Sequence, residues 1–453
     1  MQVDPSIFKS YDIRGIYGSQ LFDETALAVG KAFSKVVPTK QVIVGRDARV
    51  SGPALHGKLI EGLTSVGIDV IDVGMVSTDM YYYACATKKL PGIMITASHN
   101  PKEYNGFKMV REIPYLLSGE EGIEQMRDFI LKDDFPPAAA QPGKVETWDV
   151  MDGFVEKILD LIDVTKLPKM KVLCDTANGM VGPSLKRIFS KIPQIELVEM
   201  YFQPDGTFPN HGGDPLDPAN RKELQERVVS EKTDLGFAFD PDGDRFFTVD
   251  KTGRFVSGDF MTAILAQYFL KRKPGSAIVY DIRASHAVPN LVKASGGKPI
   301  YNKVGHAYIK KTMKNEDAVF GGEVTGHYYL ADFFYCDSGV APMLFLLDFL
   351  STSPKSLDQI IDEMEKEYFI SGEINTKGVD ANTVFEKLKS TYSTQAKEII
   401  TIDGITMEMG DWHFNVRASN TEPLVRLNLE ATTKELMEQK RDELLALIRA
   451  GGK

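Results

Sequence analysis

Three aspartates, Asp240, Asp242 and Asp244, alternate with a proline and a glycine. Small or turn-forming residues between them allow the three carboxylates to converge on one hard cation, and oxygen ligands of this kind suit Mg²⁺. A calcium-binding EF-hand is disfavoured, because its loop needs a glycine at position six and a glutamate at position twelve, where this chain has Lys251. A solvated turn is the other alternative, but three neighbouring carboxylates repel one another without a counter-ion. The segment therefore predicts a metal site.

Ser98 follows a short apolar run and stands in a turn closed by Asn100 and Pro101. A serine nucleophile needs such a position, together with a base and a group that holds the electrophile. No Gly-x-Ser-x-Gly elbow surrounds Ser98, which disfavours an acyl-transfer triad. Taken alone, the segment slightly favours a structural role, with Ser98 capping a helix.

Glu323, Thr325 and His327 lie in a segment that contains three glycines. Glycines let the backbone approach a ligand, and the three side chains offer an acceptor, a hydroxyl and a switchable donor. This set suits the vicinal hydroxyls of a sugar. A hairpin with incidental polar groups is the alternative.

A second polar segment contains Arg417 and, close behind it, Ser419, Asn420 and Thr421. The guanidinium, the hydroxyls and the backbone N–H groups of such a turn can hold a phosphate. A cluster of helix-capping residues explains the same pattern equally well.

The bulk composition limits the partners of this 453-residue chain. A formal net charge of −10 argues against a broad nucleic-acid surface, so anion binding requires a local group of basic residues. Lys310, Lys311 and Lys314 are expected to form a solvated helix face. The three cysteines show no metal or disulfide spacing, and neither a signal peptide nor a membrane span is visible. We expect a cytoplasmic protein with no membrane partner.

Short β-branched runs alternate with amphipathic stretches over the first three quarters of the chain, which predicts α/β domains with mainly parallel sheets. The predicted strands are 41–45, 68–74, 92–96, 171–175, 235–239, 277–281 and 318–320. The predicted helices between them include 53–66, 221–233 and 261–271. A buried helix is expected over 340–350. The long connection 204–220 is expected to approach the site.

The last eighty or so residues differ from the rest. Strands are expected at 399–409, 412–416 and 424–431, followed by a closing helix at 434–448, which predicts a small α+β domain. Turn residues cluster at 133–143 and more weakly near 252 and 367. We therefore expect four domains, at 1–143, 144–252, 253–367 and 368–453, each of ordinary size.

In this order, the four polar loops resemble the signatures of the α-D-phosphohexomutase superfamily, most closely those of its bacterial phosphomannomutase/phosphoglucomutase group. The similarity extends from Tyr11 to Pro423. It implies three related mixed α/β domains and a smaller C-terminal α+β domain around a central cleft. It also implies the interconversion of hexose 1-phosphate and hexose 6-phosphate, of mannose or glucose, in a monomer or a dimer. Hexose 1,6-bisphosphate would be both intermediate and activator.

The resemblance also implies a role for each matching residue. Ser98 would carry the phosphoryl group, and Asp240, Asp242 and Asp244 would hold Mg²⁺ together with a phosphoserine oxygen. The sugar would contact Glu323, Thr325 and His327. The non-reacting phosphate would be bound by Arg417, Ser419, Asn420 and Thr421. The positions that would line the reaction centre are Tyr11, Arg14, His99, Lys108, Arg245 and His306, with Lys108, Arg14 and His306 the groups for proton transfer or charge stabilisation.

The chain departs from the family pattern at three places. Thr325 replaces the usual serine of the sugar loop, Pro241 replaces a common glycine of the metal loop, and His211 is followed by two glycines where the family often has another histidine and a proline. Phosphoglucosamine mutase is an alternative, disfavoured because its phosphoserine loop usually begins with serine where this chain has Thr96. A Mg²⁺-dependent sugar phosphatase and a non-enzymatic sugar-phosphate binder are further alternatives.

Overall fold

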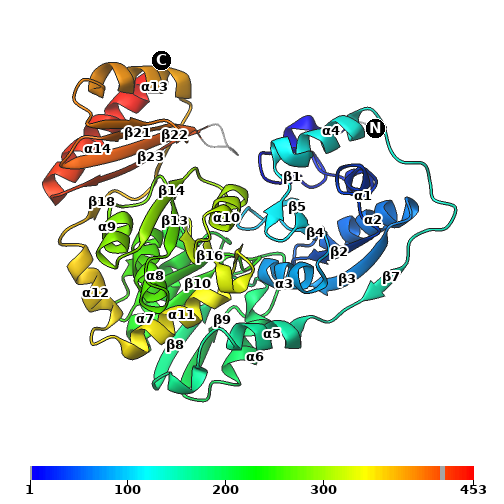
Figure 1. Ribbon diagram of the computed structural model, residues 1–453, viewed down its shortest axis with the longest axis horizontal. Helices are drawn as coiled ribbons and strands as arrows, with labels where there is room; N and C mark the ends of the chain where they lie inside the picture. The colour runs from blue at the N-terminus through cyan, green and yellow to red at the C-terminus, as the bar shows by residue number, and fades with distance from the viewer. Residues whose placement is uncertain (1–2, 419–423, 453) are drawn as a thin grey trace. The chain divides into compact units, whose positions relative to one another are not determined.

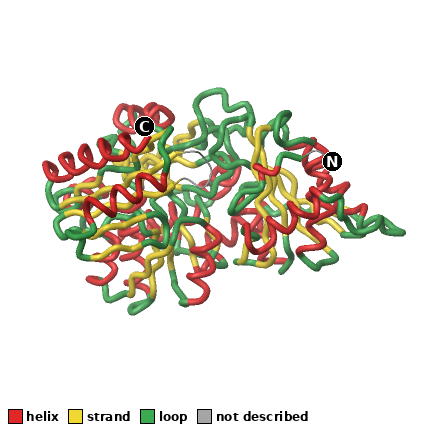
Figure 2. Tube along the Cα trace, turned by 90° about the horizontal axis from the view of Figure 1, so that it is seen from above, coloured by secondary structure: helices red, strands yellow, loops and turns green. Residues whose placement is uncertain are grey.

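The computed structural model describes residues 3–418 and 424–452. It divides into two compact units, each described by itself. Unit 1 comprises residues 1–255 and 325–353, and unit 2 comprises residues 256–324 and 354–453. In both units helices lie against sheets, as Figure 2 shows.

The first sheet of unit 1 is mixed, with β2 parallel to β3 and β4, and β5 antiparallel to β4 and β1. Its strand order is β1-β5-β4-β2-β3-β7, with β6 paired to β5. The strands are β1 (Ile13–Ile16), β2 (Gln41–Arg46), β3 (Asp69–Met75), β4 (Gly92–Ile95), β5 (Tyr104–Glu112), β6 (Tyr115–Leu116) and β7 (Val145–Thr147). The helices are α1 (Asp23–Val36), α2 (Gly52–Ser65), α3 (Thr78–Lys88) and α4 (Glu124–Leu131).

The second sheet of unit 1 has the order β12-β11-β10-β8-β9. Its strands are β8 (Met170–Asp175), β9 (Ile195–Met200), β10 (Leu235–Phe239), β11 (Phe246–Asp250) and β12 (Phe255–Val256). Every residue of β10 is buried, which explains its unbroken apolar run. The helices are α5 (Met151–Leu159), α6 (Val181–Phe189) and α7 (Pro218–Ser230), and β16 (Tyr328–Leu330) and β17 (Cys336–Asp337) form a hairpin. The buried helix predicted over 340–350 is confirmed as α11 (Val340–Thr352).

In unit 2, three parallel strands pair in the order β14-β13-β15. They are β13 (Ala277–Asp281), β14 (Lys298–Asn302) and β15 (Phe320–Gly322). The helices of this part are α8 (Gly258–Arg272), α9 (Ala287–Ala294), α10 (His306–Asn315) and α12 (Leu357–Met364). The strand predicted at 318–320 thus begins only at Phe320.

The last sheet of unit 2 is antiparallel, in the order β18-β23-β22-β21-β20 with β19 paired to β23. Its strands are β18 (Phe369–Ile370), β19 (Ile374–Lys377), β20 (Glu398–Ile400), β21 (Ile405–Glu408), β22 (Trp412–Ala418) and β23 (Leu424–Ala431). The helices α13 (Ala381–Tyr392) and α14 (Lys434–Arg449) pack on one face of it (Figure 1). The expected small α+β domain is confirmed.

Two expectations about this unit are wrong. The strand expected over 399–409 is two strands, β20 and β21, because Gly404 turns the chain with a φ of 71°. Lys310 is buried instead of solvated, although Lys311 and Lys314 are exposed. The helical repeat places Lys310 in line with the buried residues Ala307 and Met313 of α10.

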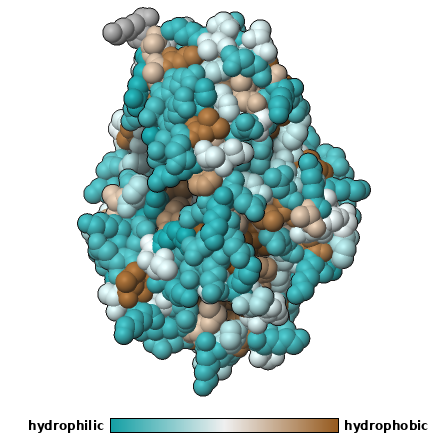
Figure 3. All heavy atoms as spheres, turned by 90° about the vertical axis from the view of Figure 1, so that its left-hand side faces the viewer, coloured by the Kyte–Doolittle hydropathy of each residue, from teal (hydrophilic) through white to brown (hydrophobic). Residues whose placement is uncertain are grey.

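The surface is mostly polar on the face shown in Figure 3, where hydrophobic side chains appear only in small groups. Among the described residues, the longest apolar helices fall short of what a bilayer crossing requires.

Candidate active site

Ser98 lies just beyond the carboxyl end of β4, an inner strand of the first sheet of unit 1. It is buried, and its backbone has a left-handed φ of 49°. The Ser98 Oγ donates a hydrogen bond to Asp240 Oδ2 at 2.7 Å and lies 3.3 Å from His99 Nδ1. The structure therefore does not support a helix cap here, because the hydroxyl is directed at the aspartate loop.

The turn around Ser98 is shaped by Arg49, a fully buried residue that follows β2. The Arg49 guanidinium donates to four backbone carbonyl oxygens at 2.6–2.9 Å, those of Ser98, Asn100, Pro101 and Tyr104. Sequence reasoning gave Arg49 no role. The only available signal was the Asp-x-Arg pattern after a strand, which recurs as Asp281 and Arg283 after β13.

The three aspartates form the connection between the paired strands β10 and β11. All three are buried, and ligand oxygens from each lie within 4.8 Å of one another. Lys108 of β5 donates to Asp242 Oδ2 at 2.7 Å and also to Asp244 Oδ2. Within the described residues, Asp242 Oδ1 and Asp244 Oδ1 are buried and accept no hydrogen bond. One oxygen of Asp242 and one of Asp244, the latter 3.6 Å from His327 Nδ1, are therefore available to a cation.

The electrostatics of this loop also fit a cation. Burial first, and the carboxylates of Asp242 and Asp244 second, raise the pKa of Asp240 well above its usual value. Burial opposes ionisation of Asp242 as well, but Lys108 holds the pKa of Asp242 below its usual value. Lys108 remains charged, because the two carboxylates raise its pKa in spite of burial. Lys108 and Arg245, whose Nε lies 3.7 Å from Asp240 Oδ2, bring two positive charges to three carboxylates, and a divalent cation would neutralise the remaining negative charge.

Arg14 and Arg245 extend the polar surroundings of Ser98. Arg14 of β1 donates to Asp12 and to the side chain of Asn100, in the Ser98 turn. The backbone N–H of Arg245 donates to Asp240 Oδ1 at 3.0 Å. Burial, followed by the charges of Arg245 and Arg14, lowers the pKa of His99 well below its usual value.

The connection 204–220 does approach these residues, as predicted. Its Asp214 Oδ1 lies 3.8 Å from Arg245 Nη1. At Gly213 the backbone comes so close that an added Cβ would lie 2.3 Å from Pro241 Cγ. A glycine is therefore required here, which explains one of the two glycines after His211.

His327 lies beside the aspartate loop. Its Nε2 accepts a hydrogen bond from Arg245 Nε at 3.2 Å, and its Nδ1 lies 3.1 Å from Asp337 Oδ2. Because Nε2 is the acceptor, the proton resides on Nδ1 and is donated to Asp337. Thr325 is half-buried in the turn before His327, and Tyr11 is half-buried just before β1.

A second group of charged side chains lies in unit 2. Arg283 and Arg426 each donate to Glu373 at 2.8 Å, one to each carboxylate oxygen. Arg417 of β22 is buried 3.9 Å from Asp403, and within the described residues its Nε and Nη1 donate no hydrogen bond. Burial and the nearby Arg283 lower the pKa of Arg417. A buried guanidinium in this state can donate hydrogen bonds to an anion.

The remaining predicted residues are not all placed by the structure. Glu323 follows β15 in unit 2, with its Oε2 3.9 Å from Arg283 Nη2. His306 is the first residue of α10, also in unit 2. Three residues, Ser419, Asn420 and Thr421, lie outside the described residues.

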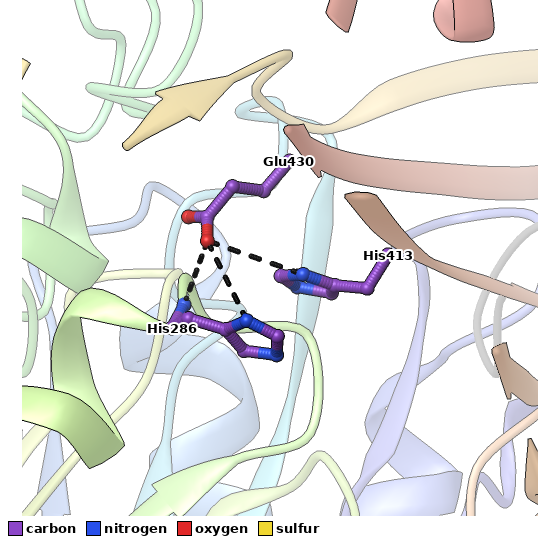
Figure 4. Close-up of side chains that lie close together, drawn as sticks. All are labelled: His286, His413 and Glu430. Atoms are coloured by element: carbon purple, nitrogen blue, oxygen red, sulfur yellow. Dashed lines mark hydrogen bonds and ion pairs between the residues drawn. The ribbon is translucent and has the colours of Figure 1, made fainter. Parts of the chain in front are cut away.

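An additional cluster in unit 2 was not predicted (Figure 4). The rings of His286 and His413 stack with their centroids 3.7 Å apart. Glu430 Oε1 accepts from the backbone N–H of His286 at 3.2 Å and lies 3.9 Å from His413 Nδ1. His286 Nε2 is 3.2 Å from Glu408 Oε1. This cluster joins the start of α9 to strands β21, β22 and β23.

The His413 ring is expected to make the free energy of unfolding depend on pH. Burial first, and the neighbouring His286 second, lower the pKa of His413 from 6.5 to about 3. Its contribution to the free energy of unfolding is therefore complete above pH 6.5 and is lost as the pH falls towards 3. Between pH 6.5 and about pH 5 we expect a loss of about 2 kcal/mol through this group.

The variant His413→Phe keeps a stacked ring but cannot bind the proton, so it is expected to lack this loss. Urea unfolding of both proteins at the two pH values measures the difference. Equal acid destabilisation of the two proteins would contradict the prediction.

Comparisons with known proteins agree with this geometry. Sequence models described as phosphoglucomutase/phosphomannomutase alpha/beta/alpha domains I, II and III match residues 5–135, 152–253 and 257–368, and that of the C-terminal domain matches 356–447. A phosphomannomutase of Salmonella typhimurium is 36% identical over 448 residues, covering 97% of this chain and 98% of its own. One of Vibrio cholerae is 37% identical over 454 residues, with 98% of each chain covered.

Among solved structures, a phosphoglucomutase/phosphomannomutase family protein of Burkholderia thailandensis superposes with a TM-score of 0.87. It is 33% identical, and the match covers 99% of this chain and 98% of that one. The agreement thus extends over the whole length of both chains.

Proposed function

This chain belongs to the phosphoglucomutase/phosphomannomutase family, and from that membership we propose that it interconverts the 1- and 6-phosphates of mannose and glucose through a phosphoserine at Ser98. As a phosphohexomutase it is an isomerase. Beyond this reaction class, we propose Ser98 as the carrier residue, hexose 1,6-bisphosphate as the intermediate, and mannose and glucose phosphates as the substrates. We also propose that the chain has the four domains predicted above, a cytoplasmic location and a monomeric or dimeric state.

One observation carries the proposal: the buried Ser98 Oγ donates a hydrogen bond to Asp240 of the aspartate loop. A phosphoryl group on this oxygen would lie beside the carboxylates that can hold a divalent cation. Phosphoryl transfer depends mainly on positioning and charge neutralisation. The aspartate loop holds Ser98 Oγ in position, and a cation bound to the same loop would neutralise charge beside that oxygen.

Asp240, Asp242 and Asp244 would hold Mg²⁺, with Asp242 Oδ1 and Asp244 Oδ1 the oxygens that no hydrogen bond occupies within the described residues. The ion would supply positive charge to the transferring phosphoryl oxygens. Lys108 would add a permanent positive charge, because its raised pKa prevents it from acting as a base near neutral pH. Arg14 would hold the Ser98 turn through Asn100.

The reaction would proceed in two transfers. In the first, the phosphorus–oxygen bond at Ser98 breaks as a bond forms to the free hydroxyl oxygen of the hexose phosphate, and the hydroxyl proton ends on Ser98 Oγ. The hexose 1,6-bisphosphate would then turn, return its other phosphate to Ser98 and leave as the isomeric monophosphate. The imidazole of His99, 3.3 Å from Ser98 Oγ, would contact the transferred proton by a hydrogen bond, while burial and the nearby arginines lower its pKa and make it a weak base.

The substrate would be held by residues of the remaining loops. Arg417 is suited to the non-reacting phosphate because its buried guanidinium retains N–H groups that donate no hydrogen bond within the described residues. Ser419, Asn420 and Thr421 would contribute to the same phosphate site. Glu323, Thr325 and His327 would contact the sugar, and Tyr11, Arg245 and His306 would line the reaction centre.

Two alternatives are distinguished from this proposal. Phosphoglucosamine mutase is not favoured, since relatives that match 97–98% of this chain at 36–37% identity are named phosphomannomutase or phosphohexose mutases. A sugar phosphatase would use the same serine and cation but would release the phosphate to water.

Steady-state assays test the function directly. We expect turnover of mannose 1-phosphate and glucose 1-phosphate, with glucosamine 1-phosphate much slower, because a contact between Glu323 and the O3/O4 side cannot distinguish the two epimers at C2. Catalytic hexose 1,6-bisphosphate should stimulate turnover without net release of inorganic phosphate. A preference for glucosamine phosphate, or stoichiometric phosphate release, would refute the proposal.

A further inference from the structure

Thr78, the first residue of α3, holds the central aspartate of the loop by two hydrogen bonds. Its backbone N–H donates to the Asp242 carbonyl oxygen, and its Oγ1 donates to Asp242 Oδ2, both at 2.7 Å. Thr78 is fully buried, and 164 positions separate the two residues in the sequence. The start of α3 is thus fastened to the aspartate loop.

Both strong donors to the Asp242 carboxylate use the same oxygen. Lys108 Nζ also donates to Asp242 Oδ2, at 2.7 Å. Asp242 Oδ1 is buried and accepts no hydrogen bond within the described part of the chain. The carboxylate therefore presents one oxygen to a ligand, while the other is occupied by protein donors.

Thr78 itself is fixed by its neighbours. Asp79 accepts hydrogen bonds from the hydroxyl of Ser77 at 2.5 Å and from the backbone N–H of Met80 at 2.9 Å. The hydroxyl of Ser338 donates to the other oxygen of Asp79 at 2.7 Å. These bonds fix the start of α3 directly beside Thr78.

We propose that Thr78 is a positioning residue that, together with Lys108 on the same oxygen, keeps Asp242 to a single ligand oxygen and so makes the aspartate loop select Mg²⁺ over Ca²⁺. Ca²⁺ accepts six to eight oxygens and readily takes both oxygens of one carboxylate, whereas Mg²⁺ requires six in a near-ideal octahedron. A carboxylate with one occupied oxygen favours the smaller ion. This inference rests on the proposed metal site.

The experiment compares cation affinities of metal-stripped full-length protein by isothermal titration calorimetry. Thr78→Val keeps the shape of the side chain but removes the hydroxyl donor. Thr78→Ser keeps the hydroxyl donor. Thr248→Val is the matched control, because Thr248 is equally buried and its Oγ1 makes no hydrogen bond within the described residues. Circular dichroism and thermal unfolding verify that each variant is folded.

For Thr78→Val we expect the Mg²⁺ affinity to fall about tenfold, the scale typical of a lost partner of a metal ligand. The Ca²⁺ affinity should be unchanged or higher, so that selectivity falls by about tenfold or more. Thr78→Ser and Thr248→Val should stay within about twofold of the unsubstituted protein. If Thr78→Val fails to fold, Thr78→Ala, which removes the same donor without a new methyl group, is measured in its place.

An unchanged ratio of the two affinities in a folded Thr78→Val or Thr78→Ala protein would overturn the proposal. A loss of selectivity in Thr78→Ser as large as in Thr78→Val would also overturn it, because Thr78→Ser keeps the hydroxyl donor. Failure of the unsubstituted protein to bind Mg²⁺ is a different result, because it would refute the metal site itself.

Discussion

Replacement of Ser98 by alanine is expected to lower mutase turnover by on the order of 10⁴-fold or more, the scale on which enzymes lose activity when a nucleophile is removed. The change deletes only the oxygen that would carry the phosphoryl group. Arg49 binds the carbonyl oxygen of Ser98 and not its side chain, so the turn should keep its conformation. Binding of the sugar phosphate should therefore persist.

Intact-mass measurement supplies a second result for this variant. Some unsubstituted molecules should carry one added phosphate, and Ser98→Ala molecules should carry none. Ser184→Ala is a suitable control, since Ser184 is also fully buried and, within the described residues, its hydroxyl donates only to a carbonyl oxygen of α6. Substantial turnover in Ser98→Ala protein that carries no other phosphate would show that the carrier is a different residue.

The second large effect is expected for Asp242→Asn. Loss of a partner of a metal ligand typically reduces metal affinity 10–100-fold, so loss of the ligand charge itself should exceed about a hundredfold. The amide oxygen can still accept from Thr78 and Lys108, and Lys108 keeps its ion pair with Asp244. The variant should therefore fold while losing turnover at ordinary Mg²⁺ concentrations.

Activity measured across a Mg²⁺ titration tests this expectation. The unsubstituted enzyme should lose activity in EDTA and regain it with Mg²⁺, while Asp242→Asn should need far higher concentrations. Activity of the unsubstituted enzyme that survives thorough chelation would contradict the role of the loop.

The fold was predictable where local patterns are strong. The strand over 235–239 was placed correctly because its five consecutive apolar residues are all buried. The split between β20 and β21 was missed although Gly404 was visible, because apolar residues continue on both sides of the turn. Lys310 was misplaced because two adjacent lysines obscured the helical period of the buried residues.

The candidate site was predictable only for residues within the polar loops. The aspartates and Ser98 were found because they lie in short segments of unusual composition. Arg49 and Thr78 were not found, because their partners are 49 and 164 positions away in the sequence. Contacts over such distances depend on the topology of the sheets, which a single sequence does not reveal.

The buried guanidinium of Arg49 has a consequence for protein engineering. The backbone path of the turn at Ser98 is maintained by four hydrogen bonds from a side chain outside that turn. The turn that contains Ser98 would therefore not keep its conformation if it were transferred to another protein alone. A designer who transfers this turn into another scaffold must also provide a guanidinium that donates to its carbonyl oxygens. Lysine could not replace arginine in this role, because its ammonium lacks the planar arrangement of five N–H donors.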